Sequence, residues 1–399
     1  MYHPIYCFNQ HGKYGNLTIL DWLVIYGNDI GLDVYDGGDC FIINTYSPEL
    51  LRITFGDDCN KFNGLIISKE TGELLCHSID SELDITEFSN KVQWKDIIIE
   101  EYLEGTLIQC FFHPIKKEWQ LASKCRADLD HKWSSKKTFF ELFDEIINTQ
   151  ELFKILNRDF SYAFLLVHED NIIINPMNEN MVYHLESRNM KTGICYNIDL
   201  GLPKPKRYRD AISYDDPMND LPDFEFNFSP ENWVVEMREY IENKKDWRKG
   251  GYILYDIFHN WRTHIKPRKW AEVQVILDSV SHPSMKYKIM KLHKDEKWGS
   301  IATLLENCPH VRSDYQWVQD KYFHVVSMLH KLYIDIYIEK KTIVMTREQW
   351  FSRHLLYRIH SIYLDHVKKG IKYSIDFNDI MNCIEKKCSS NELWSIFIC

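Results

Sequence analysis

The stretch EEYLEGTLIQCFFH, residues 100–113, predicts two β-strands joined by a tight turn at Glu104 and Gly105. Apolar residues precede and follow the Glu-Gly pair, as expected for a strand on either side of a break. Glycine is common at such breaks because it lacks a Cβ atom. Tyr102 lies at the end of the first predicted strand.

Similar strand patterns fill most of the first half of the chain, with helical patterns between them. In NGLIISKETGELLCHS (63–78), two apolar runs flank a Thr-Gly-Glu turn, which predicts a β-hairpin. KTFFELFDEIINTQELFKIL (137–156) has the apolar spacing of a helix. The further predicted segments are three strands in 95–125, strands in 162–189, a linker at 202–230, a helix at 230–245, and strands at 250–258 and 262–268.

From about residue 270 the pattern becomes helical. Three long amphipathic helices are expected, with Thr346 as the N-cap of the second and Ser374 as the N-cap of the third. The three segments are 314–341, 346–370 and 374–388.

The predicted fold class is α+β. A domain of antiparallel sheets with flanking helices is expected at 1–285, followed by a helical C-terminal domain at 286–399. A chain of 399 residues is long enough for two such domains.

The net charge of −10 argues against a protein that coats nucleic acid by bulk attraction. Basic residues nevertheless gather in three runs: PKPKRYRD from 203, KKDWRKGG from 244 and RTHIKPRKW from 262. The acidic run DDPMNDLPDFEF from 215 lies among them. Such runs are either solvated faces or a ligand-facing patch. The 23 Tyr, 21 Phe and 12 Trp residues would serve the core or stack on flat ligands.

The 11 cysteines are scattered without a CxxC pair, which predicts reduced thiols in a cytosolic compartment. Cys383 and Cys388 have no His or Cys at metal-ligand spacing, so zinc is not expected. No signal layout and no apolar run of ~20 residues is found, so we expect a soluble cytoplasmic protein without a membrane segment. The histidines of the predicted helices are also spread too widely to predict a metal cluster: His324, His330, His354 and His360.

The order of these segments resembles that of the covalent nucleotidyltransferases, in particular RNA ligases of the phage T4 RNA ligase 1 type and their relatives in large DNA viruses. The hairpin at 63–78 looks like the family's RGIIFD-turn-TGE segment, and EEYLEGTLI looks like its motif I strand, usually E-K-x-D-G-S-L. EWQLASKCRADLDHKWSSKKTFFELFDE resembles the segment after motif I, and YAFLLVHEDNIIINPMNENMVYHLESRNMKTG resembles motif III and its continuation. GGYILYD and THIKPRKW resemble motifs IV and V. The similarity covers about residues 50–285.

The resemblance implies a chemistry in which a motif I lysine attacks the α-phosphate of a nucleotide and forms a phosphoramidate. The lysine position is Tyr102, a phenol that cannot form this bond. The motif III glutamate position is Leu165, and the position of the metal-binding motif IV glutamate is Gly250. The first motif V lysine is His264. Because these groups are replaced together, catalysis by this route is not expected.

The resemblance therefore implies a pseudoenzyme that binds an RNA end or a nucleotide, and a capped mRNA 5′ end is the first candidate. Tyr102 would stack on a base, while Lys266 and Lys269 would contact phosphates. No catalytic residue, metal ligand or cofactor is expected, since only an active ligase would need ATP and Mg²⁺. The implied nucleotide- or RNA-binding residues are Tyr102, Glu104, Gly105, Lys124, His264, Lys266, Arg268 and Lys269.

Two alternatives stay open. One is a working ATP-dependent RNA ligase that uses a displaced lysine, and the other is a structural scaffold whose pocket is filled by side chains. Tyr102 would also be explained as a space-filling aromatic residue, and the basic residues of THIKPRKW as a solvated strand end. The C-terminal helices would offer a surface for RNA or for a protein partner, in viral translation or RNA processing.

Overall fold

The computed structural model describes residues 19–399 except 78, 133–135, 175–178, 212–227, 245, 250 and 257–260. Gly250 and the acidic run that begins at 215 therefore lie outside the described residues. The chain divides into two compact units, Met1–Ala271 and Glu272–Cys399, so the division falls earlier than the predicted residue 285. The first unit contains antiparallel sheets with flanking helices and the second is helical, which confirms the predicted α+β fold class.

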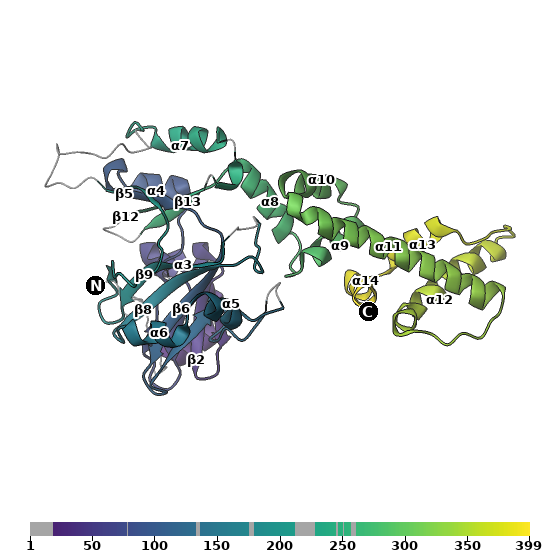
Figure 1. Cartoon of the computed structure of the whole chain (residues 1–399), viewed down its shortest axis with the longest axis horizontal. Coiled ribbons are helices and arrows are strands. Elements are labelled where there is room, and N and C mark those ends of the chain that lie inside the picture. The colour runs from purple at the N-terminus through teal and green to yellow at the C-terminus, as the bar shows by residue number, and fades with distance from the viewer. Residues whose placement is uncertain are drawn as a thin grey trace. The chain divides into compact units, whose positions relative to one another are not determined.

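Three antiparallel sheets make up the N-terminal unit (Figure 1). The first sheet has the order β1-β2-β3-β4, the second β10-β9-β8-β6-β7, and the third β11-β5-β12-β13. The strands are β1 Leu32–Asp36, β2 Cys40–Thr45, β3 Leu65–Ser68, β4 Leu74–Cys76, β5 Ile97–Glu101, β6 Thr106–His113, β7 Glu118–Ser123, β8 Phe160–Val167, β9 Met181–Asn189, β10 Cys195–Tyr196, β11 Arg207–Arg209, β12 Tyr252–Asp256 and β13 Arg262–Ile265.

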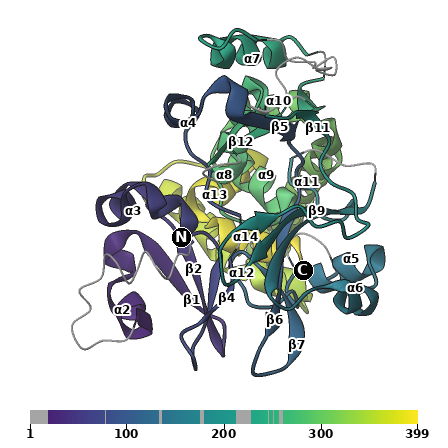
Figure 2. The same ribbon diagram turned by 90° about the vertical axis from the view of Figure 1, so that its left-hand side faces the viewer.

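Each sheet is associated with its own apolar cluster, and helices complete the clusters. Figure 2 shows the helices α5 and α6 beside the strands of the second sheet. Phe62 lies in the cluster of the first sheet with α2 and α3, and Phe164 in that of the second sheet with α5 and α6. Trp233 of α7 stacks on Trp94 in the third cluster, with ring centroids 5.3 Å apart. The helices are α2 Ile19–Tyr26, α3 Pro48–Phe55, α4 Ile85–Lys91, α5 Phe139–Ile146, α6 Thr149–Ile155 and α7 Trp233–Glu242.

The chain crosses from the third sheet to the second through residues 102–105, which we call the crossover. β5 ends at Glu101 and β6 begins at Thr106, and the two strands belong to different sheets. The crossover contains no turn, so the predicted tight turn is wrong. A Cβ atom on Gly105 would lie 2.7 Å from the carbonyl oxygen of Leu166 in β8. Glycine is therefore required by the close approach of two segments and not by a turn.

Two predicted segments of the N-terminal unit differ in detail from the structure. The helix predicted at 137–156 is two helices, because the Asn148 side chain accepts hydrogen bonds from the amides of Gln150 and Glu151 and begins α6. Part of the predicted linker at 202–230 forms the edge strand β11 and pairs with β5. Local polar contacts and edge pairing therefore add elements that apolar periodicity did not show.

The predicted strand at 262–268 is shorter than expected. It ends at Ile265, and α8 begins at Arg268 directly after Pro267. Proline has no amide hydrogen and favours the first helical turn over a strand interior, which explains the change. The basic residues of THIKPRKW are consequently divided between a strand end and a helix start.

The C-terminal unit consists of helices joined by short connections. Thr346 caps α12 through a capping box with Gln349, as predicted, whereas the predicted cap at Ser374 is wrong because Asp376 caps α13. The helix predicted at 314–341 is α-helical to Tyr333 and then forms a π-helical segment, Ile334–Ile338. The helices are α8 Arg268–Asp278, α9 Met285–Lys294, α10 Trp298–Asn307, α11 Arg312–Tyr333, α12 Arg347–Lys368, α13 Phe377–Lys387 and α14 Ser390–Phe397.

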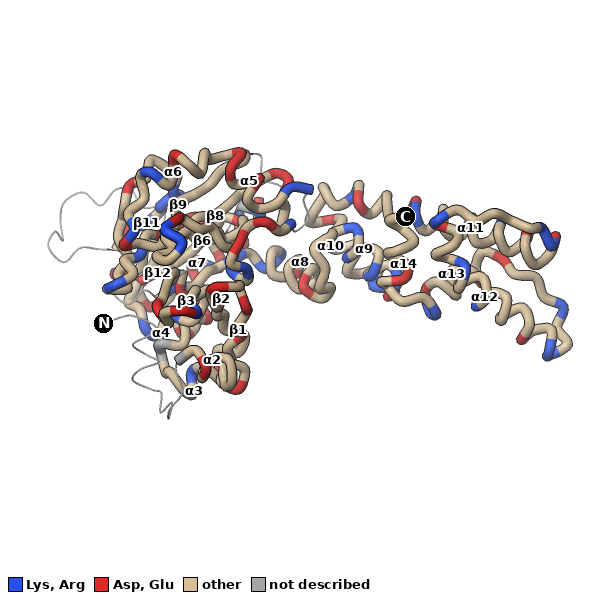
Figure 3. Tube along the Cα trace, turned by 90° about the horizontal axis from the view of Figure 1, so that it is seen from below, with Lys and Arg blue, Asp and Glu red and all other residues tan. Residues whose placement is uncertain are grey.

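Acidic and basic residues are interspersed along the Cα trace of each unit (Figure 3). This mixture agrees with the argument from net charge against bulk attraction to nucleic acid. Within the described part of the chain, no helix combines the length and apolar character needed to cross a membrane.

Candidate nucleotide-binding cavity

A cavity of about 620 Å³ lies in the N-terminal unit, where the crossover passes between the second and third sheets. We call it the crossover cavity. Its wall combines the end of β5 and the crossover with parts of β6, β8, β9, β12 and β13. The lining residues that bear on its chemistry are Asp80, Glu82, Glu100, Glu101, Tyr102, Gly105, Lys124, Leu165, Glu186 and Arg262.

Tyr102 lies in this wall directly after β5. Its amide donates a hydrogen bond to the carbonyl oxygen of Gly251 at 3.0 Å, and a Cβ atom on Gly251 would lie 2.9 Å from Tyr102 Cβ. The close approach holds the tyrosine against the start of β12. Burial and the carboxylates of Glu104 and Glu82 raise the pKa of the Tyr102 phenol above its usual value. Tyr102 is therefore neutral at physiological pH and offers a ring and a hydroxyl, but no amine.

Lys266 places its ammonium group against the ring of Tyr102. The Nζ atom lies 3.9 Å from the centroid of the Tyr102 ring and 3.5 Å from that of the Trp270 ring. Aromatic rings attract a cation at this distance by ~0.5–2 kcal/mol each. Burial lowers the pKa of Lys266 to about 8, although Glu82 and Glu104 oppose this effect. The amine is thus held between two rings and loses its proton more readily than an ordinary lysine.

Glu104 orients this aromatic cluster. Its Oε1 accepts a hydrogen bond from the Trp270 indole at 2.5 Å, and its Oε2 accepts one from the amide of Ile174 at 3.1 Å. Both carboxylate oxygens therefore have donors from the protein. Glu104 consequently positions Trp270 over Lys266, and its contribution to a ligand site would be indirect.

The other residues implied by the family resemblance lie around the cavity in different ways. His264 forms an ion pair with Glu82, which belongs to the wall. Arg268 and Lys269 are exposed residues in the first turn of α8 and do not line the cavity. The implied residues that do line it are Tyr102, Gly105 and Lys124.

The wall of the crossover cavity carries more carboxylates than cations. Four of the carboxylates have basic partners. His264 pairs with Glu82, Arg188 pairs with Asp80 and Glu186, and Arg207 pairs with Glu100. The carboxylates are Asp80, Glu82, Glu100, Glu101 and Glu186, and the cations are Lys124 and Arg262.

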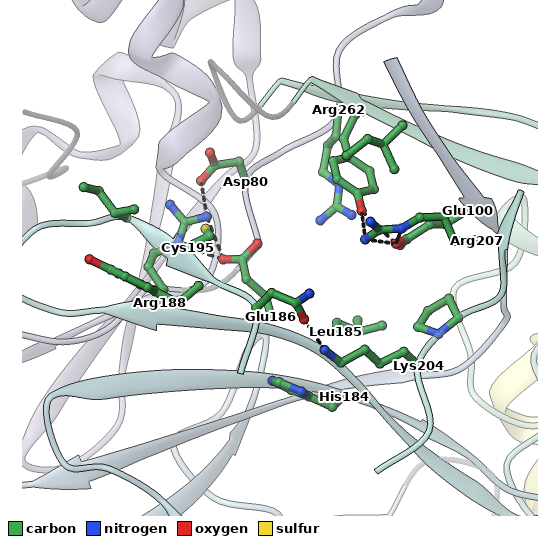
Figure 4. A pocket seen from close by; sticks show the side chains of 16 residues that line it. Asp80, Glu100, His184, Leu185, Glu186, Arg188, Cys195, Lys204, Arg207 and Arg262 are labelled. Carbon is green, nitrogen blue, oxygen red and sulfur yellow. Dashed lines mark hydrogen bonds and ion pairs between the residues drawn. The ribbon is translucent and has the colours of Figure 1, made fainter. Parts of the chain in front are cut away.

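A second cavity, of about 510 Å³, shares part of this wall (Figure 4). We call it the arginine chamber because Arg188, Arg207 and Arg262 line it. One nitrogen of Arg207 lies 3.0 Å from Glu100 Oε1, which also accepts a hydrogen bond from the Tyr255 hydroxyl at 2.7 Å. This network joins the edge strand β11 to β5 and β12.

Arg188 is the buried centre of a second network in the arginine chamber. Its guanidinium lies 3.4 Å from Asp80 and 2.7 Å from Glu186, and only 2% of its side chain is exposed. Burial alone would lower the pKa of Arg188, but the two carboxylates raise it above its usual value. His77 lies 3.0 Å from the same Asp80 oxygen. The network ties β9 to the segment before α4.

The metal ion that the resemblance associates with motif IV has no matching set of ligands in the described wall. Leu165, which the resemblance puts at the motif III position, lines the cavity with an apolar side chain. Gly250, at the motif IV position, lies outside the described residues. The paired carboxylates already have basic partners.

Trp270 and Arg188 are the main residues of the site that sequence reasoning missed. Trp270 is present in THIKPRKW at position i+4 from Lys266, a spacing that suits contact at a helix start. Arg188 gives no comparable signal, because a single arginine near the end of a predicted strand is ordinary. Its importance follows only from the buried Asp80 and the partly buried Glu186 beside it.

No protein-family model and no curated protein sequence matches the chain. Among solved structures it is similar to an archaeal ATP-dependent RNA ligase, form 1, at 11% identity, over 76% of this chain and 79% of that one, with a TM-score of 0.43. Form 2 of an archaeal ATP-dependent RNA ligase is 9% identical, over 78% of this chain and 79% of that one, with a TM-score of 0.40. A putative ATP-dependent DNA ligase from Aquifex aeolicus is 10% identical, over 79% of this chain and 81% of that one, with a TM-score of 0.39. At TM-scores below 0.5 these likenesses assign neither family nor function, so the function is inferred from the residues of the cavity.

Proposed function

We propose that this protein binds a nucleotide or an RNA end in the crossover cavity without forming a covalent bond to it. The observation that carries this proposal is Tyr102, which stands in the cavity wall at the end of β5. The resemblance to nucleotidyltransferases puts the reactive lysine at this position. A neutral phenol cannot form the phosphorus–nitrogen bond of the covalent intermediate, but its ring can stack on a base.

The ligand class that suits this wall is a capped RNA 5′ end. The 7-methylguanine base of a cap carries a positive charge, which suits an aromatic ring beside an unpaired carboxylate such as that of Glu101. The Glu101 carboxylate lines the cavity and has no ion pair with any residue that the structure describes. Lys124 and Arg262 would meet the phosphates that follow the base. A role in translation or RNA processing would follow from this specificity.

The proposal is tested by fluorescence titration of the full chain with a short RNA carrying either a methylated cap, an unmethylated cap or a 5′ triphosphate. We expect the methylated cap to bind most tightly. Tyr102→Ala should weaken its binding by ~1–3 kcal/mol, because a base-stacking ring is lost. Tyr357→Ala, an exposed tyrosine of the helical unit, is the matched control and should have no effect.

Salt dependence separates stacking from phosphate contact in the same titrations. Lys124→Ala should reduce the dependence of affinity on salt concentration by ~0.7–0.9 in logarithmic slope, because one phosphate contact is lost. Tyr102→Ala should leave the slope unchanged. Equal affinity for all three RNAs, unaffected by Tyr102→Ala, would remove the cap-binding proposal. Absence of any saturable binding would favour the scaffold alternative.

A second candidate function, a ligase with a displaced lysine, is favoured by one observation. The Lys266 amine lies against Tyr102, and burial lowers its pKa to about 8. In that reaction, neutral Nζ would attack the α-phosphorus of ATP, pyrophosphate would leave, and the proton released from nitrogen would pass to solvent. Non-covalent binding is the better-supported function, because two rings cover the amine and Lys266 is not part of the cavity wall.

The two candidates predict different results with α-labelled ATP or GTP and Mg²⁺. Non-covalent binding predicts that no label remains on the denatured protein. The displaced-lysine ligase predicts a labelled adduct that is lost in Lys266→Met and kept in Lys269→Met. Mass-spectrometric mapping of an adduct to Lys266 would replace the first proposal by the second.

A further inference from the structure

We propose that the C-terminal unit contains a zinc site formed by His354, Cys388 and Glu392. Each residue offers one ligand atom, and these atoms all lie within 4.8 Å of one another. His354 belongs to α12, Cys388 follows α13 as its C-cap, and Glu392 lies in the first turn of α14. We call this meeting point of three helices the helix junction. A metal ion there would join all three helices.

The backbone around the helix junction holds the ligands in place. Ser389 and Glu392 form the capping box of α14, in which Glu392 Oε2 accepts a hydrogen bond from the Ser389 amide at 2.7 Å. The other carboxylate oxygen, Oε1, lies 3.6 Å from His354 Nε2. The cap therefore fixes the carboxylate and directs its second oxygen toward the histidine.

The histidine and the cysteine have polar atoms that the protein does not satisfy well. His354 Nε2 is buried and has no hydrogen-bond partner in the described structure. The Cys388 side chain is only 3% exposed, and its thiol has a single weak contact, 3.5 Å from the carbonyl oxygen of Ser389. A buried nitrogen without a partner costs free energy, and coordination to a metal would remove this cost.

The chemistry of this ligand set points to zinc rather than to magnesium or calcium. One nitrogen, one sulfur and one carboxylate oxygen form a set that Zn²⁺ accepts, whereas Mg²⁺ and Ca²⁺ prefer oxygen alone. A Cys388 thiolate and the Glu392 carboxylate would together neutralise the two charges of the ion. Three protein ligands leave the fourth tetrahedral position to water or to another ligand. Binding would release the thiol proton of Cys388 to solvent.

Arg358 is the residue with which the metal ion would compete. One of its guanidinium nitrogens lies 3.5 Å from Glu392 Oε1, the same oxygen that would bind zinc. Arg358 also donates a hydrogen bond to the carbonyl oxygen of Lys387, so its side chain has a second partner to hold it. A positive charge thus already lies beside the carboxylate, and removing it should favour the metal.

The experiment is a titration of the full chain, first stripped with a chelator, with Zn²⁺ in competition with a chromophoric chelator. We expect one zinc ion per chain. Cys388→Ser and His354→Gln should each lower the affinity more than about 100-fold, since loss of even an outer-shell partner costs ~10–100-fold. Cys399→Ser and His324→Gln, residues of the same types outside the junction, are the matched controls and should bind as the wild type does. Arg358→Gln should bind zinc more tightly.

Substitution by Co²⁺ gives a readout that does not depend on stability. Sulfur coordination should produce an intense thiolate-to-cobalt charge-transfer band in the wild type that is absent in Cys388→Ser. Circular dichroism of the metal-free variants, matched to the wild type, shows that they are folded. No zinc above background in the wild type, or an unchanged cobalt spectrum in folded Cys388→Ser, would overturn the proposal.

Discussion

The ion pairs of the arginine chamber and those of the helix junction differ in how far their charges are removed from water. In the arginine chamber, the side chains of Arg188 and Asp80 are each only 2% exposed, and Arg188 lies between Asp80 and Glu186. At the helix junction, the side chains of His354 and Glu392 are 35% and 37% exposed, and His354 Nε2 lies 3.6 Å from Glu392 Oε1. A buried pair is costly to break, whereas a loose and partly exposed pair contributes little and can give way to another ligand.

The largest expected effect tests whether the paired charges hold the N-terminal unit together. Arg188→Met should lower the free energy of unfolding of this unit by about 3–5 kcal/mol, because Asp80 would keep a buried charge, and Glu186 a partly buried one, without the arginine. Urea denaturation followed by tryptophan fluorescence measures the loss. Arg207→Met is the control, since 42% of the Arg207 side chain is exposed and such pairs contribute only ~0–1 kcal/mol. Equal effects of the two substitutions would contradict the distinction between buried and exposed pairs.

The next prediction concerns the crossover that forms part of the cavity wall. Gly105→Ala should destabilise the N-terminal unit by about 1–3 kcal/mol, because the new Cβ atom would lie 2.7 Å from the Leu166 carbonyl oxygen. Gly299→Ala in α10 is the matched control, as no atom lies within 4 Å of its new Cβ atom. This helical substitution should be neutral or stabilising by up to ~1 kcal/mol. Thermal denaturation of both variants checks the contrast, and a silent Gly105→Ala would show that the crossover lies farther from β8.

A pH experiment examines Lys266, the cation that has aromatic rather than carboxylate partners. Its pKa of about 8 in the folded protein is below the usual 10.5, so between these pH values the unfolded chain binds more protons. Stability of the wild type should therefore rise with pH in this window, and the burial cost of the charged amine is fully present below pH 8.

Lys266→Met should remove this contribution. Between pH 7.5 and 10, the stability of the wild type should rise by about 2 kcal/mol relative to that of Lys266→Met, on the scale of ~1.4 kcal/mol per pKa unit. Urea denaturation at several pH values measures the difference, with Lys269→Met, an exposed lysine, as the control. Parallel pH profiles for the wild type and Lys266→Met would show that the amine is not desolvated.

The smallest expected effect belongs to the metal-free helix junction. His354→Gln should change the free energy of unfolding by less than about 0.5 kcal/mol in the presence of a chelator, because its 3.6 Å pair with Glu392 is partly exposed. The same substitution should abolish the stabilisation by added Zn²⁺. A large loss of stability without metal would show that the junction, like the cavities, depends on its own charges.

Much of the secondary structure was predictable because its signals are local. The hairpin of β3 and β4, the strands β5, β6 and β7, and the capping box of Thr346 all follow from residues a few positions apart. The errors have two causes. Gly105 suggested a turn, but its small size serves the approach to the distant strand β8. The cap of α13 was placed at Ser374, two residues before Asp376, because several residue types can cap a helix and the pattern leaves the first residue uncertain.

The candidate sites were predictable only in part. Tyr102, Gly105 and Lys124 do line one cavity, while Arg268 and Lys269 lie outside its wall. The carboxylates that outnumber the cations there come from several strands and loops. A local sequence pattern cannot show that these residues share one wall, because they come together only after the sheets have formed.

The sequence alone was enough to predict most of the strands and helices and the change from an α+β unit to a helical unit. Apolar periodicity, caps and residue identity carry this information over a few neighbouring positions. The tertiary structure alone established that β5 and β6 belong to different sheets, that Lys266 lies between Tyr102 and Trp270, and that Cys388 meets His354. These arrangements depend on packing between segments that are far apart in the chain. Local sequence patterns do not show which distant segments will pack together.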